Sequence, residues 1–73
     1  MKEDERLLLK KLKERGRGLQ PSALEISKSI NMAYKRARYI LRDKWERKGW
    51  YDCGVSWRVG WLTRKAFHSK IEA

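Results

Sequence analysis

The chain is poor in the residues that build disulfides and metal centres, with one cysteine, Cys53, and one histidine, His68, among 73 residues. A lone cysteine excludes an internal disulfide, and a single histidine leaves a zinc site short of ligands. We therefore expect no metal, no cofactor and a reducing compartment, the cytoplasm. Nothing beside Cys53 indicates a lowered pKa, so we expect a partly buried, unreactive thiol.

Long apolar runs are also missing. No stretch approaches the roughly 18 apolar residues of a membrane-spanning helix, and the three leucines at 7–9 are followed at once by two lysines. We therefore expect no membrane span and no secretory signal at the N-terminus.

Groups for catalysis are scarce as well. Nine carboxylates are scattered along the chain, and the single histidine provides no positioned acid–base pair. The glycines at 16 and 18 lack the lysine and the strand–helix context of a phosphate-binding loop. We predict that the protein is not an enzyme.

Positive charge is abundant, since 19 Lys and Arg oppose nine Asp and Glu for a net charge of +10. The cations concentrate at 6–17 and 35–48, and again after Asp52, where the next acidic residue is Glu72. An ordered domain tolerates such a surplus most readily when its partner is a polyanion. Nucleic acid is the favoured partner, an anionic membrane surface the second, and a merely solvated surface remains the alternative.

The first half of the chain predicts helices. Three acidic residues followed by leucines predict a helix over 3–15, which Gly16 ends. Ser22 and Glu25 have the spacing of a capping box, which predicts a short helix over 22–30, and Asn31 favours a left-handed turn. A third helix is predicted from Met32 or Ala33 to about Lys48, ended by Gly49, and the connector at 16–21 has room for extended residues around Leu19.

In the second half of the chain the spacing of the apolar residues changes from a helical to an alternating pattern. Alternation at 57–61 predicts a strand, which we expect to pair with 50–53 across a tight turn near 54–56. Thr63 is then expected to cap a last helix from Arg64 to about Lys70. We expect the aromatic core to come from Trp45, Trp50 and Trp61. The fourth tryptophan, Trp57, is expected to be exposed.

This order of elements resembles the winged helix-turn-helix DNA-binding family over roughly residues 5–67. The segment 22–31 is similar to the second helix and turn of that family, the helix ending at 45–50 to its recognition helix, and 50–62 to its wing. The resemblance implies an α+β fold in one domain, 1–73, with three helices, a two- or three-stranded β-wing and a short C-terminal helix. It implies a cytoplasmic, nucleoid-associated protein that binds double-stranded DNA and regulates transcription, either sequence-specifically or generally.

The resemblance also implies roles for individual residues, because it puts the helix at about 32–48 in the major groove and the 50–62 wing on the backbone or minor groove. Base or groove contacts are expected from Lys35, Arg36, Arg38, Tyr39 and Arg42. Phosphate contacts are expected from Ser22, Lys28, Lys44 and Arg47. The wing would contribute Arg58 and Trp57.

Two other functions stay open. The many aromatic residues would also suit an RNA-binding winged helix, which we rank below duplex DNA. The chain could instead be a protein-interaction module. Because a 73-residue protein can cover only a short stretch of DNA, sequence-specific binding would need a homodimer or a larger nucleoprotein complex.

Overall fold

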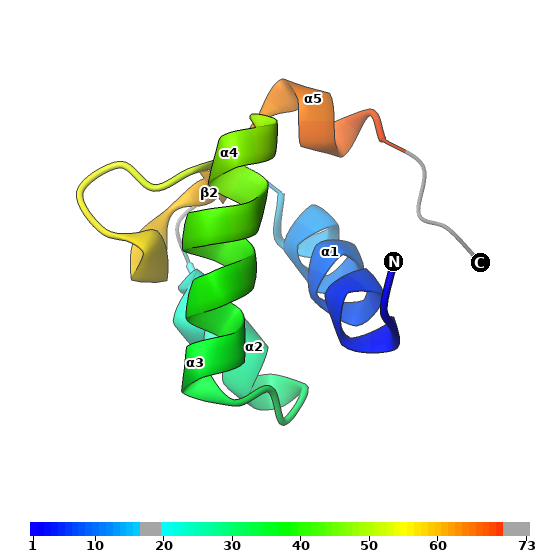
Figure 1. Cartoon of the computed structure of the whole chain (residues 1–73), viewed down its shortest axis with the longest axis vertical. Helices are drawn as coiled ribbons and strands as arrows, with labels where there is room; N and C mark the ends of the chain where they lie inside the picture. The colour runs from blue at the N-terminus through cyan, green and yellow to red at the C-terminus, as the bar shows by residue number, and fades with distance from the viewer. Residues whose placement is uncertain (17–19, 70–73) are drawn as a thin grey trace.

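The computed structural model describes residues 1–16 and 20–69, and its longest element is a continuous helix over 34–48 (Figure 1). The fold is α+β: helices dominate, and two short strands form an antiparallel pair. The elements in chain order are α1 (Glu3–Arg15), α2 (Ala23–Ser29), α3 (Tyr34–Arg38), η1 (Tyr39–Trp45), α4 (Glu46–Lys48), β1 (Tyr51–Asp52), η2 (Trp57–Val59), β2 (Trp61–Leu62) and α5 (Arg64–Phe67). We call the continuous run α3–η1–α4 the long helix.

Helix α1 has the predicted bounds. Leu8, Leu9 and Leu12 are fully buried, and three carboxylates occupy the first turn, where the helix dipole favours negative charge. Gly16 adopts φ 82° and its amide donates to the carbonyls of Leu12 and Lys13, which ends the helix as predicted.

Helix α2 begins with the predicted capping box. The Glu25 amide donates to Ser22 Oγ at 3.2 Å, and the Ser22 amide donates to Glu25 Oε2 at 3.3 Å. Asn31 adopts the expected left-handed conformation, with φ 59°. The amides of Met32 and Asn31 donate to the carbonyls of Ser27 and Lys28, the pattern of a Schellman ending that turns the chain into the long helix.

The long helix begins at Tyr34, later than predicted, and no side chain caps its first turn at Ala33. Its middle segment, η1, is wound as a π-helix and buries Ile40, Leu41 and Trp45. Gly49 ends the helix as predicted, with φ 78°. The amide of the following residue, Trp50, donates to the Trp45 carbonyl at 2.8 Å, and the two indole rings pack with their centroids 6.0 Å apart.

The predicted hairpin is present but shorter. Tyr51 pairs with Leu62, and Asp52 pairs with Trp61. The prediction of a strand from 57 is wrong, because 57–59 form the single 3₁₀ turn η2. The buried Tyr51 hydroxyl donates to the Trp57 carbonyl at 2.7 Å and holds that turn against β1.

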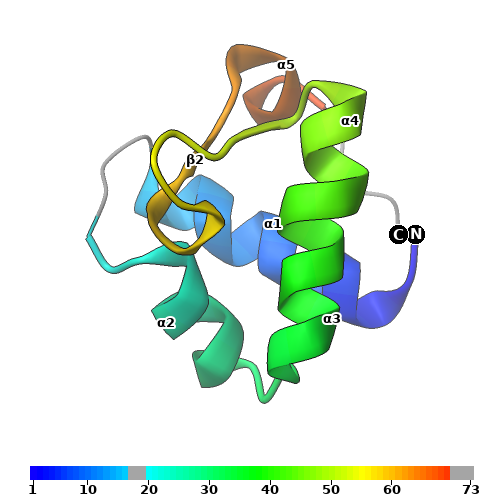
Figure 2. The same ribbon diagram turned by 60° about the vertical axis from the view of Figure 1, so that its left-hand side comes forward.

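The core lies between the long helix, α1, α2 and the hairpin (Figure 2). Trp45 and Trp50 are buried as predicted, and Trp61 is half-buried. The expectation that Trp57 is exposed is wrong. Its side chain is 8% exposed, because η2 folds back onto α2 and its ring meets Tyr34 edge-on at 5.3 Å.

Helix α5 follows β2 and lies at the α4 end of the long helix (Figure 1). Thr63 occupies the N-cap position, but the prediction that its side chain caps α5 is wrong: Thr63 Oγ1 donates instead to the Gly49 carbonyl at 2.5 Å. The expected helix end near Lys70 is wrong, because α5 ends at Phe67 and His68 and Ser69 are no longer helical. The extended residues expected around Leu19 lie outside the described residues. Across 1–16 and 20–69, no helix is long and apolar enough to cross a membrane.

Candidate nucleic-acid interface

One face of the long helix carries exposed cations on successive turns. Lys35, Arg38 and Arg42 are exposed, and Tyr39 lies among them at 49% exposure. Within the described ranges, no carboxylate forms an ion pair with any of these three cations. We call Lys35, Arg38, Tyr39 and Arg42 the basic stripe. Four of the five residues predicted to contact bases therefore lie together on one exposed surface.

Arg36, the fifth, borders the basic stripe, with its guanidinium 5.9 Å from the centre of the Tyr39 ring, but it is paired with carboxylates of α1. Its Nε donates to Asp4 Oδ2 at 2.8 Å, and a second guanidinium nitrogen lies 3.2 Å from Glu5 Oε1. The hydrogen bond between Arg36 and Asp4 lowers the pKa of the Asp4 carboxyl and raises the pKa of the Arg36 guanidinium. Arg36 is thus held against α1 and does not join the basic stripe.

Lys44 lies on this same inner face, eight residues after Arg36. Its ammonium donates to both oxygens of Glu5, at 2.8 and 2.9 Å. The Glu5 side chain is only 3% exposed, so its charge is balanced by the two cations rather than by water. The structure thus places Lys44, a predicted phosphate ligand, inside an ion cluster formed by Asp4, Glu5, Arg36 and Lys44.

The other predicted phosphate ligands are dispersed. The Ser22 hydroxyl accepts the capping hydrogen bond of α2, and Lys28 is exposed near the end of the same helix. Arg47 is exposed on α4, at the end of the long helix that lies away from α2 (Figure 2). The structure therefore does not bring these residues into one cluster.

Arg58 projects from η2 toward the first turn of the long helix. Its guanidinium donates to Tyr34 Oη at 2.8 Å and lies 5.9 Å from the centre of the Tyr34 ring and 5.7 Å from that of Trp57. The sequence reasoning missed Tyr34 as an exposed partner, because no local pattern reports a contact between residues 24 positions apart.

In the part of the chain that the structure describes, the cations of the long helix are thus divided between an inner face that is neutralised by α1 and an outer face that no carboxylate neutralises. No family model, curated protein or solved structure matches the chain.

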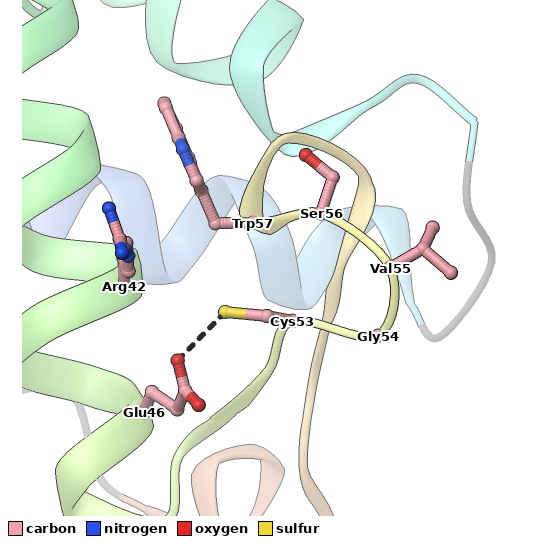
Figure 3. A pocket seen from close by; sticks show the side chains of 7 residues that line it. All are labelled: Arg42, Glu46, Cys53, Gly54, Val55, Ser56 and Trp57. Atoms are coloured by element: carbon pink, nitrogen blue, oxygen red, sulfur yellow. Dashed lines mark hydrogen bonds between the residues drawn. The ribbon is translucent and has the colours of Figure 1, made fainter.

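A hollow of about 280 Å³ opens beside the basic stripe, between the long helix and the loop at 53–60 (Figure 3). Its lining consists of Arg42, Glu46, Cys53, Gly54, Val55, Ser56 and Trp57. The Cys53 thiol donates to Glu46 Oε2 at 3.0 Å. Partial burial, together with this carboxylate, raises the pKa of Cys53 to about 12, so the thiol stays protonated near neutral pH and its expected lack of a lowered pKa is confirmed.

Proposed function

We propose that the chain is a winged helix-turn-helix domain that binds double-stranded DNA and regulates transcription. The long helix enters the major groove, and the loop at 53–60 acts as the wing against the backbone or the minor groove. One observation carries this proposal: carboxylates of α1 neutralise the inner cations of the long helix, whereas no carboxylate within 1–16 and 20–69 forms an ion pair with the exposed Lys35, Arg38 or Arg42.

Exposed and unpaired cations favour a polyanionic partner. Like charges on successive turns of a helix repel one another and destabilise it by a few tenths of a kcal/mol per pair. Phosphates remove this repulsion and release counterions on binding. The major groove is about 12 Å wide and admits one helix, whose outward side chains then reach base edges. The basic stripe has the residue types that such contacts use.

The arrangement of Arg58 supports the assignment of the wing. Its guanidinium is held beside Tyr34 at the first turn of the long helix, so wing and helix present cations at adjoining positions. A ligand as broad as a duplex can contact both, because phosphate contacts position the protein while base contacts read the sequence.

Fluorescence anisotropy with labelled duplex DNA tests the proposal. We expect micromolar or tighter binding at about 50 mM salt, weakening with a log–log slope near −0.9 for each phosphate neutralised. Arg38→Ala should weaken binding while leaving the thermal midpoint nearly unchanged, whereas Lys10→Ala, at an exposed site on α1, is the matched control. Binding that is absent, or indifferent to salt, would refute the proposal.

The same titration separates the alternatives. Tighter binding to single-stranded or structured RNA of equal length would replace duplex DNA with RNA as the ligand. Sedimentation with and without duplex would report whether a second copy of the chain joins the complex, as a small footprint leads us to expect for specific binding.

A further inference from the structure

The outer side of the long helix carries a carboxylate next to its cations. A negative charge is unexpected on a surface that is proposed to bind a polyanion. Glu46 is exposed one helical turn after Arg42, and both line the hollow beside the loop at 53–60 (Figure 3). Among the described residues the two side chains form no ion pair with each other. A donor and an acceptor therefore stand side by side, each open to a ligand.

The Glu46 carboxylate is held in place from the loop side. Cys53 donates its thiol hydrogen to Oε2 at 3.0 Å, and no hydrogen bond within the described ranges engages Oε1. One oxygen is thus anchored while the other remains free to accept. Cys53 acts here as a positioning residue, because it would touch no ligand atom itself.

The edge of a G·C base pair in the major groove complements this arrangement. Guanine presents two acceptors, O6 and N7, which a guanidinium engages with two hydrogen bonds, and cytosine presents an amino group that a carboxylate accepts. An A·T pair also has an amino group, but it lies on adenine beside N7, where guanine has O6. An arginine that faces the purine then meets one acceptor instead of two, and a carboxylate that faces the pyrimidine meets O4 and the methyl group of thymine instead of an amino group.

We propose that Arg42 and Glu46 together read G·C base pairs in the major groove, with Cys53 orienting Glu46. This inference rests on the proposed function. Arg42 supplies the donors for guanine, and Glu46 accepts from the amino group of cytosine. At an A·T pair in the same orientation the carboxylate faces thymine O4, which is itself an acceptor, so Glu46 also selects by weakening complexes with A·T sites.

The opposite signs of these two effects make the inference testable. The probes are two labelled 20-base-pair duplexes, one of alternating G·C pairs and one of alternating A·T pairs, titrated at the same salt concentration. The duplexes also differ in groove shape, so the ratio of their dissociation constants is compared between variants rather than taken alone. For the wild type we expect preference for the G·C duplex by about fivefold or more.

Glu46→Ala should tighten binding to the A·T duplex and weaken binding to the G·C duplex, so that the ratio falls severalfold. Asp43→Ala is the matched control: it removes the same charge from an exposed position of the long helix that does not line the hollow. It should tighten both complexes alike and leave the ratio unchanged. Cys53→Ser retains a donor and should preserve the ratio, whereas Cys53→Ala should lower it.

Equal effects of Glu46→Ala and Asp43→Ala on both duplexes would overturn the inference, since Glu46 would then be a repulsive charge only. A wild-type ratio near one would overturn it as well. If the wild type binds neither duplex, the proposed function fails and this inference fails with it. If the wild type binds both and the ratio survives Glu46→Ala, the proposed function stands and this inference alone is wrong.

Discussion

Replacing Glu5 with glutamine removes the charge that Arg36 and Lys44 share, while leaving the size of the side chain almost unchanged. Glu5 is buried, and its two oxygens lie 2.8 and 2.9 Å from the Lys44 ammonium. The substitution leaves both cations without this countercharge, and of the carboxylates that the structure describes Asp4 alone still pairs with Arg36. The expected result is a less stable contact between α1 and the long helix.

The magnitude follows from the exposure of the groups. Removing one partner from a fully buried ion pair costs about 3–5 kcal/mol. Here the Arg36 and Lys44 side chains are 27% and 37% exposed, so water recovers part of that loss. We expect the free energy of unfolding to fall by about 2 kcal/mol, which lowers the melting temperature of a domain of this size by about 8–16 °C.

Thermal and urea unfolding followed by circular dichroism measure this loss. Glu14→Gln is the control, because Glu14 is exposed and lies 3.9 Å from Lys11, and it should change the free energy by less than about 0.5 kcal/mol. In the double variant Glu5→Leu, Lys44→Met, the destabilisation should be smaller than the sum of the two single effects. Equal melting temperatures for Glu5→Gln and Glu14→Gln would refute the reasoning.

Three further predictions concern acid sensitivity, the thiol and a close backbone approach. The hydrogen bond from Arg36 lowers the pKa of Asp4 below its ordinary value of 3.8, so the contribution of Asp4 to stability is present above that value and is lost as the pH falls through the lowered pKa. Urea unfolding should therefore show Asp4→Asn destabilising the protein less at pH 3 than at pH 7, and an equal or larger loss at pH 3 would contradict this. Since the pKa of Cys53 is raised to about 12, its alkylation by iodoacetamide at pH 8 should be at least about tenfold slower than that of a free cysteine peptide, and a rate equal to the peptide's would contradict the structure. Gly60→Ala would drive a methyl group into the Tyr51 ring and a backbone carbonyl of β1, so we expect a loss of about 1–3 kcal/mol by thermal unfolding, and unchanged stability would show that the approach is looser than described.

Local signals in the sequence predicted the helices well because their causes lie within a few residues. The capping box of Ser22 and Glu25 spans a single turn, and the left-handed conformations of Asn31 and Gly49 follow from their own backbone preferences. The bounds of α1 and the end of the long helix could therefore be predicted, as could the existence of the hairpin.

What the sequence could not predict depends on contacts between distant segments. The alternation at 57–61 suits a strand, yet the hydroxyl of Tyr51 holds the Trp57 carbonyl in a 3₁₀ turn, and η2 buries the indole against α2. The ion cluster joins Glu5 to Lys44 across 39 positions, so no local pattern could separate Arg36 from its neighbours in the basic stripe. The residue types of the candidate site and the helix that carries them could thus be predicted. The pairing of Arg36 and Lys44 with α1 could not, because it depends on tertiary packing.

The π-wound segment has a consequence for how relatives of this chain would align with it. A π-helix has room for one residue more than an α-helix over the same span, and an α-helix turns by about 100° per residue. Deleting one residue within 39–45 would let the segment wind as an ordinary α-helix and keep the residues before it on the same side relative to Trp45 and Trp50, whereas winding all seven residues as an α-helix would turn them by about that angle. A homologue with a plain α-helix would therefore need a one-residue gap inside this segment, and a gapless alignment would match the basic stripe to the wrong face of its helix.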